Sequence, residues 1–367
     1  MREARGMVVP TRGAPARIEP IVVDPPGPGE VLVRLVANGV CHSDLWAIEH
    51  GNWGSPFPML LGHEGAGIVQ EVGDGVDHVG VGDRVLLAWA VPCGDCPACH
   101  RGLPRRCAHG WQQPPRLHTT EGATLTGTLS IGGLATHTVV QAAQAISIPA
   151  GLDLEAACLL GCGASTGIGA AVNTAPVRPG DTIAVIGLGG IGLSALQGAR
   201  LAGAERLIAV DRVAAKLDIA RTLGATDVVD AAVDDPVTAV RALTDGGVDV
   251  SFEAVGNAAV VSQAVAMLAR GGTAVAIGVP APDSTVTLDW GEDTLGAAYP
   301  TKATLKVTDG GDPLLEDFHA WLLAAEEGRL DLGALVTNVA SFTDEALAEA
   351  FRAMLAGEVI RTVIRFD

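Results

Sequence analysis

The sequence lacks a cluster of positive charge, a long apolar run and an export signal. No segment is rich in lysine and arginine, and 24 basic residues stand against 42 acidic ones, a formal net charge of −18. A surface of that sign repels phosphate, so neither nucleic acid nor an anionic membrane is an expected partner. Apolar runs are broken by glycine or charge before they reach the roughly 20 residues of a membrane-spanning helix. The segment Met1–Pro10 has no signal-like apolar core, so we expect a soluble cytoplasmic protein.

Apolar residues are otherwise plentiful, at 48% of the 367 residues against 18% charged. This balance is typical of a globular protein, and the length exceeds what one hydrophobic core usually covers, which predicts two domains. The seven cysteines are an odd number in a chain without an export signal. That combination argues against a disulfide framework and favours thiolates that bind metal.

The secondary-structure pattern changes twice along the chain. The first third predicts short strands, beginning with the apolar run Glu30–Asn38 and separated by glycine and aspartate turns. After Asp181, strand-like and helix-like segments alternate from Thr182 to Ile277, which predicts a parallel sheet covered by helices. The end of the chain predicts two amphipathic helices, at 312–328 and 343–356, and a closing strand that returns to the first domain.

The strongest local motif is a set of four closely spaced cysteines, Cys93, Cys96, Cys99 and Cys107. Four soft donors supplied by one short segment predict a closed, tetrahedral, structural zinc site. Four buried or redox-active cysteines that merely lie close together, or an iron–sulfur cluster, are the alternatives.

The second motif is Gly187-Leu-Gly189-Gly-Ile-Gly192, which follows a predicted strand and opens a predicted helix. This context predicts a dinucleotide site, with the pyrophosphate at the helix N-terminus. Asp211, at the end of the next strand, would accept the ribose hydroxyls of NAD and repel the additional phosphate of NADP. NAD is the expected cofactor, although Arg212 leaves some use of NADP open.

A third set of candidates is scattered along the chain: Cys41, His63 and Cys162. Two thiols and one imidazole suit a catalytic zinc ion, because they leave the fourth position for water or substrate. Each residue alone would be an ordinary buried side chain.

These motifs occur together and in the order found in the zinc-dependent medium-chain alcohol dehydrogenases, which the chain resembles over nearly its whole length. The resemblance implies an α/β protein. A GroES-like, β-rich catalytic domain at 1–163 and 303–367 would enclose a Rossmann NAD-binding domain with a doubly wound parallel sheet at 164–302. It also implies two zinc ions per subunit, with the substrate in the cleft between the domains.

The resemblance assigns roles residue by residue. Cys41, His63 and Cys162 would bind the catalytic zinc, and Glu64 and Asp44 would support these ligands. Ser43 would hold the substrate hydroxyl and relay its proton. The remaining assignments concern NAD: His42 and Arg361 at the pyrophosphate, Lys216 at the adenosine ribose, Thr166 on the nicotinamide side, and the turn Gly187, Gly189 and Gly192 with Asp211.

Many relatives have a histidine that completes the proton relay where this chain has Trp46, so the relay would end at the cofactor ribose, at water or at His50. Trp89 would line the substrate pocket or simply pack in the core. Cys158 matches no ligand role and is expected to be a buried thiol.

The implied reaction is the NAD-dependent interconversion of an alcohol and its aldehyde. The alcohol would be a primary one, either aryl, allyl or aliphatic. The alternative substrate is a formaldehyde–thiol adduct, because the stretch from Trp89 to Gly163 also resembles the mycothiol-dependent formaldehyde dehydrogenases. A non-enzymatic relative with the same fold is a remote alternative, and the zinc-free quinone reductases lack these ligands. The segment from Cys107 to Cys162 is long enough to keep a loop that some tetrameric relatives lack, which favours a homodimer.

Overall fold

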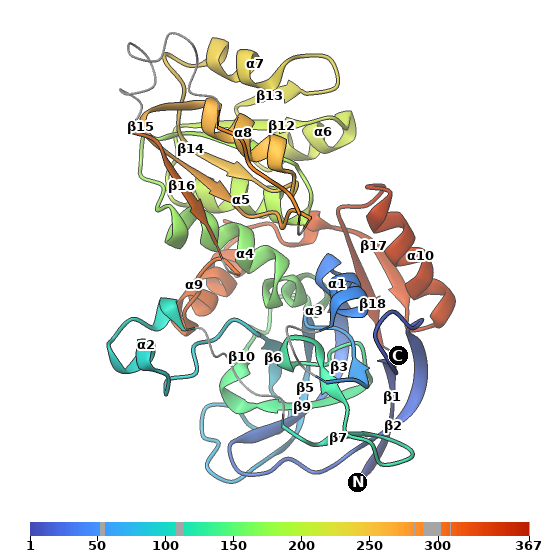
Figure 1. Ribbon diagram of the computed structural model, residues 1–367. Coiled ribbons are helices and arrows are strands. Elements are labelled where there is room, and N and C mark those ends of the chain that lie inside the picture. The colour runs from blue at the N-terminus through green and yellow to red at the C-terminus, as the bar shows by residue number, and fades with distance from the viewer. Residues whose placement is uncertain (52–55, 108–113, 282, 289–301, 309, 367) are drawn as a thin grey trace. The chain divides into compact units, whose positions relative to one another are not determined.

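The computed structural model describes residues 1–51, 56–107, 114–281, 283–288, 302–308 and 310–366, and its elements are labelled in Figure 1. The chain forms two compact units. The first unit contains Met1–Gly163, Leu314–Gly328 and Leu332–Asp367, and the second contains Ala164–Pro313 and Arg329–Asp331.

The first unit is built on β-structure. Its strands are β1 (Arg2–Val9), β2 (Arg17–Val23), β3 (Glu30–Gly39), β4 (Met59–Leu60), β5 (Gly65–Val72), β6 (Arg84–Leu87), β7 (Leu117–Thr119), β8 (Thr126–Gly127), β9 (His137–Gln141), β10 (Ala145–Ser147), β17 (Val336–Ser341) and β18 (Arg361–Arg365). Within the described residues they form a five-stranded sheet, β7-β2-β1-β4-β8, and a seven-stranded sheet, β10-β6-β5-β3-β18-β17 with β9 also paired to β3. The long central strand β3 pairs with β5, β9 and β18, and most of its residues are buried.

Short helices connect and cover these strands. They are α1 (His42–His50), α2 (Pro97–His100), α3 (Leu154–Ala157), α9 (Leu315–Glu326) and α10 (Asp344–Leu355), with 3-10 turns η1 (Pro104–Arg106), η2 (Thr128–Ser130), η3 (Ala142–Gln144), η4 (Cys158–Gly161) and η6 (Gly333–Leu335). Helix α10 is capped by Thr343, whose side chain accepts a hydrogen bond of 3.2 Å from the backbone N–H of Ala346. The two helices and the closing strand predicted at the end of the chain correspond to α9, α10 and β18.

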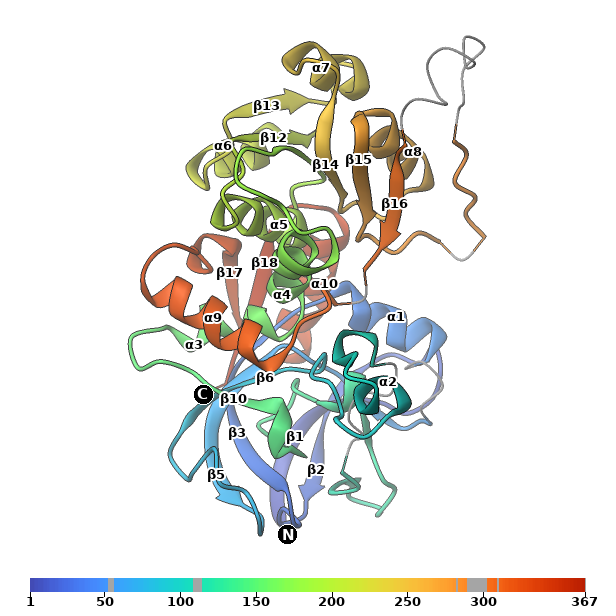
Figure 2. The same cartoon turned by 90° about the vertical axis from the view of Figure 1, so that its left-hand side faces the viewer.

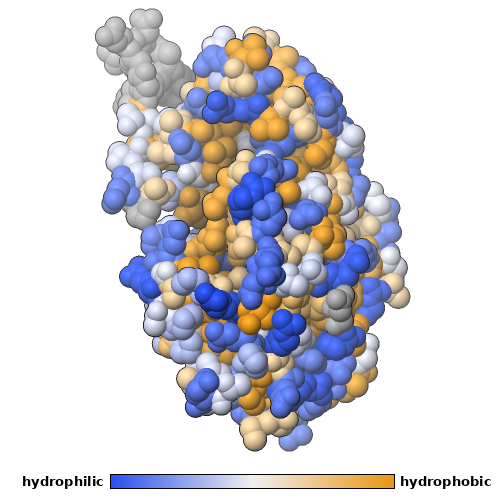
Figure 3. All heavy atoms as spheres, turned by 90° about the vertical axis from the view of Figure 1, so that its right-hand side faces the viewer, coloured by the Kyte–Doolittle hydropathy of each residue, from blue (hydrophilic) through white to orange (hydrophobic). Residues whose placement is uncertain are grey.

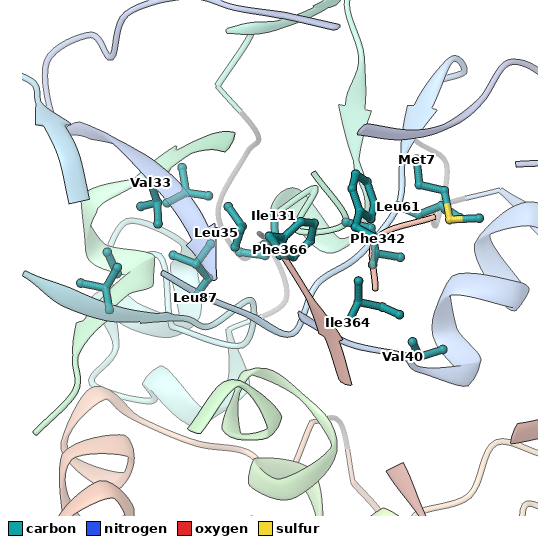
Figure 4. Close-up of a cluster of buried hydrophobic side chains, with 14 of the residues drawn as sticks. Met7, Val33, Leu35, Val40, Leu61, Leu87, Ile131, Phe342, Ile364 and Phe366 are labelled. Carbon is teal, nitrogen blue, oxygen red and sulfur yellow. The ribbon is translucent and has the colours of Figure 1, made fainter. Parts of the chain in front are cut away.

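The core of the first unit joins residues from both ends of the chain. Val33, Leu35 and Leu87 from the central sheet lie in one buried cluster with Phe342, Ile364 and Phe366 (Figure 4). The rings of Phe342 and Phe366 are 4.8 Å apart between centroids. Burial of these large apolar groups is the main source of stability for such a unit, and it fixes the strands that carry the site described below.

The second unit is a six-stranded sheet in the order β13-β12-β11-β14-β15-β16, and all of its pairings are parallel. Its elements are α4 (Gly163–Gly169), the π-helical turn η5 (Ala170–Thr174), β11 (Thr182–Ile186), α5 (Gly190–Leu201), β12 (Arg206–Asp211), α6 (Ala214–Thr222), β13 (Asp227–Asp230), α7 (Pro236–Leu243), β14 (Val248–Glu253), α8 (Ala258–Ala266), β15 (Leu268–Ala276) and β16 (Thr304–Val307). The helices that connect the strands of this sheet, α5 to α8, are labelled in both views (Figures 1 and 2).

Alternate residues of β11 face different helices. Ala184 and Ile186 belong to a buried cluster that includes Val240 of α7 and Ala264 of α8. Val185 points the other way, toward Gly192 of α5, where an added Cβ would lie 3.4 Å from its side chain. Helices therefore cover both faces, and the doubly wound parallel sheet predicted from the sequence is confirmed.

One boundary differs from the expectation. The sequence placed residues from 303 onward in the first domain, but β16 pairs with β15 in the parallel sheet, with Thr304 opposite Thr273. The second unit continues to Pro313. The strand is short and all four of its residues are exposed, so it carries no buried apolar pattern from which it could be recognised.

No single helix among the described residues is long and apolar enough to span a membrane; Leu154–Gly161 and Gly163–Thr174 meet that test only as a bent pair. Apolar and polar residues are interspersed on the face drawn in Figure 3. Exposed apolar side chains such as Val81 and Val233 are ordinary for a globular protein.

Candidate functional site

Four cysteines of the first unit come together in the segment that contains α2 and η1. One sulfur each from Cys93, Cys96, Cys99 and Cys107 lies within 4.8 Å of all the others. The sulfur atoms of Cys96 and Cys99, and those of Cys93 and Cys107, are 3.6 Å apart, too far for a disulfide bond. This four-thiol group has the donor set of a closed, structural zinc site.

The lobe that carries these cysteines is fastened to α9. The guanidinium of Arg105, in η1, forms an ion pair of 2.7 Å with the carboxylate of Asp317. The same Asp317 oxygen accepts a hydrogen bond of 2.7 Å from the backbone N–H of Leu314 at the start of the helix. One side chain therefore caps the helix and holds the lobe.

A second group of metal-binding residues is buried inside the first unit. Cys41, His63, Glu64 and Cys162 each offer a donor atom within 4.8 Å of the others, and all four are buried. Cys41 is the N-cap of α1, His63 and Glu64 directly precede β5, and Cys162 follows η4. The scattered residues predicted from the sequence are thus assembled by the central sheet.

Asp44 orients His63. Both side chains are completely buried, and His63 Nδ1 lies 3.2 Å from Asp44 Oδ1, which also accepts a hydrogen bond of 2.9 Å from the backbone N–H of Gly62. A carboxylate at Nδ1 favours the tautomer whose Nε2 carries a lone pair. His63 Nε2 is buried and has no hydrogen-bond partner among the described residues, so it is available to a metal ion.

The two thiols of this group shift each other's pKa in opposite directions. The hydrogen bond with Cys162 is the largest of the factors that lower the pKa of Cys41 well below its usual value. The same contact, together with burial, raises the pKa of Cys162. A dication bound by these two sulfurs would stabilise both as thiolates. The donor set fits zinc.

Glu64 is paired with Arg361. An Arg361 Nη2 hydrogen bond reaches Glu64 Oε2, and the backbone N–H of Gly163 donates to Glu64 Oε1 over 3.1 Å. Burial raises the pKa of Glu64 to about 7, while the positive charge of Arg361 opposes this shift. The family resemblance assigned Arg361 to a pyrophosphate and did not predict that this carboxylate is its partner.

The residues proposed for proton transfer lie on α1. Ser43 is partly buried in the first turn, next to the N-cap Cys41. Trp46 and His50 lie one turn apart, with ring centroids 4.1 Å from each other, and His50 is exposed. His42 is exposed, Trp89 packs against the core cluster, and Cys158 is a buried thiol that donates to the carbonyl of Glu155.

The glycine motif lies in the turn between β11 and α5 in the second unit. Gly187 has φ +89°, and a Cβ on Gly192 would lie 1.8 Å from the carbonyl oxygen of Gly187. These two glycines are required by the backbone itself. A Cβ on Gly189 would meet no described atom within 4 Å, so the space beside this N-cap is open. Open space at a helix N-terminus suits a phosphate group.

Asp211 ends β12 and connects this turn to the start of α6. One carboxylate oxygen accepts a hydrogen bond of 2.7 Å from the N–H of Leu188, and the other accepts one of 2.9 Å from the N–H of Val213. Each oxygen has a further lone pair for a ligand hydroxyl. Lys216 is in the first turn of α6 and Thr166 is buried in α4, both within the second unit.

Comparison with known proteins shows which proteins this chain is similar to. Residues 27–150 match the alcohol dehydrogenase GroES-like domain, and residues 190–307 match the zinc-binding dehydrogenase family. The chain is 36% identical to S-(hydroxymethyl)glutathione dehydrogenase from Synechocystis sp., over 99% of this chain and 100% of that protein, and equally identical to the enzyme of that name from Escherichia coli, with the same coverage.

Solved structures give a similar result. An alcohol dehydrogenase zinc-binding domain protein from Burkholderia ambifaria has a TM-score of 0.90 at 32% identity, covering 100% of this chain and 99% of that chain. Benzyl alcohol dehydrogenase from Acinetobacter calcoaceticus has a TM-score of 0.88 at 30% identity, with both chains fully covered.

Proposed function

Because the chain belongs to the zinc-dependent medium-chain alcohol dehydrogenases, we propose that it oxidises the hydroxymethyl adduct of formaldehyde and a low-molecular-weight thiol with NAD. The reaction type is supported by one observation, the buried donor set of Cys41, His63 and Cys162 with its two carboxylates. The substrate class is supported by full-length similarity to S-(hydroxymethyl)glutathione dehydrogenases.

Zinc bound by Cys41, His63 and Cys162 would act as a Lewis acid that lowers the pKa of a substrate hydroxyl. Asp44 keeps the imidazole of His63 in the orientation and tautomer that such a ligand needs. Glu64, held by Arg361 and the N–H of Gly163, is fixed beside the same ligands. Ser43 would accept the hydroxyl proton and pass it on, and no covalent nucleophile is required.

The nicotinamide ring of NAD would accept the hydride. The turn Gly187, Gly189 and Gly192 would hold the pyrophosphate, assisted by His42 and Arg361, and the open space at Gly189 supports this role. Asp211 would accept the ribose hydroxyls, with Lys216 nearby and Thr166 on the nicotinamide side.

The resemblance implied a catalytic domain at 1–163 and 303–367 and a cofactor-binding domain at 164–302. We now propose that residues 303–313 belong to the cofactor-binding domain, because β16 pairs with β15.

A hydrophobic primary alcohol is the second candidate, favoured by the similarity to benzyl alcohol dehydrogenase. The two candidates differ in their response to a thiol. With formaldehyde as substrate, we expect NAD reduction only after glutathione or mycothiol is added, and little turnover of benzyl alcohol. Cys162→Ser, which removes one zinc ligand, is the inactive control.

Rapid oxidation of benzyl alcohol that no thiol affects, together with no response to formaldehyde and thiol, would replace the first candidate by the second. Comparing glutathione with mycothiol identifies which thiol the enzyme accepts. Absence of NAD reduction with every alcohol and adduct in a zinc-loaded preparation would contradict both.

A further inference from the structure

A polar network at the end of the second unit is not explained by the zinc or glycine motifs. Asp312 Oδ2 accepts a hydrogen bond of 2.5 Å from the hydroxyl of Thr174 and one of 3.3 Å from the hydroxyl of Thr308. The two hydroxyls are themselves 2.7 Å apart. Lys306 Nζ donates to the carbonyl oxygen of Thr174 over 2.7 Å. The network joins the end of β16 to the end of η5, two elements distant in the sequence.

Asp312 has an unusual backbone conformation. Its φ is +51°, and it follows Gly310 at +62° and Gly311 at +82°. Left-handed φ values are unfavourable for a residue with a side chain, although aspartate and asparagine tolerate them better than most residues. The hydrogen bonds of the Asp312 carboxylate therefore have a definite effect: they hold the turn Gly310–Asp312 in this conformation.

The turn lies against the backbone of α4. A Cβ on Gly311 would be 2.5 Å from the carbonyl oxygen of Ser165 and 2.8 Å from that of Thr166. The side-chain amide of Asn173 donates to the carbonyl oxygens of Gly311 and Asp312, at 3.3 and 3.4 Å. Contact without an intervening side chain means that a shift of the turn would be transmitted directly to the backbone at Thr166.

We propose that Asp312 is a positioning residue for the nicotinamide half of the cofactor. Its carboxylate anchors the turn Gly310–Asp312 through Thr174 and Thr308, and the turn fixes the backbone of Thr166. The inference rests on the proposed function for the assignment of Thr166 to the nicotinamide side. It adds a part of the cofactor site that the glycine motif and Asp211, at the adenosine and pyrophosphate half, do not supply.

The two halves of the cofactor can be tested separately, because ADP-ribose contains the adenosine and pyrophosphate groups but no nicotinamide. We would measure the dissociation constants of NADH and ADP-ribose by calorimetry for the wild type and three variants. Asp312→Gly permits the left-handed backbone and removes the carboxylate. Thr174→Val removes the donor hydroxyl but keeps the shape of the side chain. Asp312→Asn keeps one acceptor oxygen on the side chain, and asparagine tolerates the left-handed backbone conformation.

For Asp312→Gly and Thr174→Val we expect NADH to bind about tenfold more weakly, the usual scale for losing a hydrogen bond to a charged group, with ADP-ribose changed less than about twofold. Asp312→Asn should recover most of the NADH affinity. Thermal unfolding identifies variants that fail to fold, and if Asp312→Gly is one, Thr174→Val and Asp312→Asn still provide the comparison.

Equal weakening of NADH and ADP-ribose would mean that the turn supports the whole dinucleotide site, and it would overturn the inference. Unchanged NADH binding in both Asp312→Gly and Thr174→Val would overturn it as well. A wild type that binds neither ligand would instead contradict the proposed NAD-dependent function, and the inference with it. Binding of NADH and ADP-ribose by the wild type therefore distinguishes a failure of this inference from a failure of the proposed function.

Discussion

The guanidinium of Arg361 is paired with the carboxylate of Glu64 inside the first unit, although the two residues are separated by 297 positions in the chain. Both side chains are at least nine-tenths buried. A buried charge needs a compensating partner, because removing it from water is costly. The pair thus ties the last strand, β18, to the loop that supplies His63.

Removing one partner of this pair should destabilise the protein strongly. Arg361→Met leaves the Glu64 carboxylate buried without its cation, and we expect a loss of about 3–5 kcal/mol in the free energy of unfolding. The measurement is urea unfolding of the zinc-loaded protein. The double variant Arg361→Met with Glu64→Gln should lose less than Arg361→Met alone, whereas strictly additive losses would show that the two groups are not coupled.

The two metal sites should respond differently to loss of a ligand. Cys162→Ser should leave a folded, inactive protein with about one zinc ion per chain, because the four-thiol site remains complete. Cys99→Ser should be unstable, because it breaks the four-thiol site and removes the metal-binding free energy that would stabilise the lobe between Cys93 and Cys107. Elemental analysis and circular dichroism check both outcomes. A wild type purified without chelators that contains no zinc would refute the assignment of both sites.

Asp211 should determine the preference for NAD. Its carboxylate would repel the 2′-phosphate of NADP, so Asp211→Gly should narrow or reverse the preference, with Arg212 free to meet the phosphate. The measurement is kcat/KM for both cofactors. Because Asp211 also accepts hydrogen bonds from Leu188 and Val213, Asp211→Asn is the control that keeps one acceptor oxygen. Equal efficiency of the wild type with NAD and NADP would disprove the role.

Proton transfer should depend on Ser43. Ser43→Ala should lower turnover by about 10²-fold or more, the usual contribution of a positioned proton acceptor, while zinc content and NADH binding persist. Full activity in Ser43→Ala would exclude the proposed relay.

The onward path beyond Ser43 can be examined with two further variants on α1. Trp46 donates a hydrogen bond but accepts no proton, so Trp46→His should raise turnover near neutral pH if proton release limits the rate. A large loss of turnover in His50→Gln at unchanged zinc content would identify His50 as the group that accepts the proton from Ser43 and passes it to solvent. No loss of turnover would mean that the cofactor ribose or a water molecule has this role. Pre-steady-state proton release, followed with a pH indicator, distinguishes these cases.

His137 should make the protein less stable in mild acid. Burial, with the charges of Arg2 and Arg34, lowers the pKa of His137 to about 4. Between this value and the usual histidine pKa of about 6.5, the unfolded chain binds a proton that the folded chain does not. Stability should therefore fall as the pH decreases from 6.5 toward 4. His137→Gln should flatten this dependence in thermal unfolding scans, and an unchanged slope would rule out the effect.

Much of this protein could be predicted from the sequence because the decisive signals are local or chemically specific. The four-cysteine segment supplies a complete ligand set from neighbouring residues, and the glycine motif needs only one turn between a strand and a helix. The alternation of segments from Thr182 to Ile277 indicated the parallel sheet, since its strands are buried on both faces and read as apolar runs. The identities of Cys41, His63 and Cys162 were predicted through a resemblance, and their donor atoms do come together.

Other features were decided only by the tertiary structure. The pairing of Arg361 with Glu64 depends on β18 lying beside β3, a contact between distant segments. Strand β16 joins the parallel sheet although its residues are exposed, so backbone hydrogen bonds rather than an apolar pattern determine its place. The turn at Asp312 contacts α4, a segment far away in the sequence, and nothing in the sequence indicated this contact. In each case the sequence contains the residues, while the distances between them arise only when separate segments pack together.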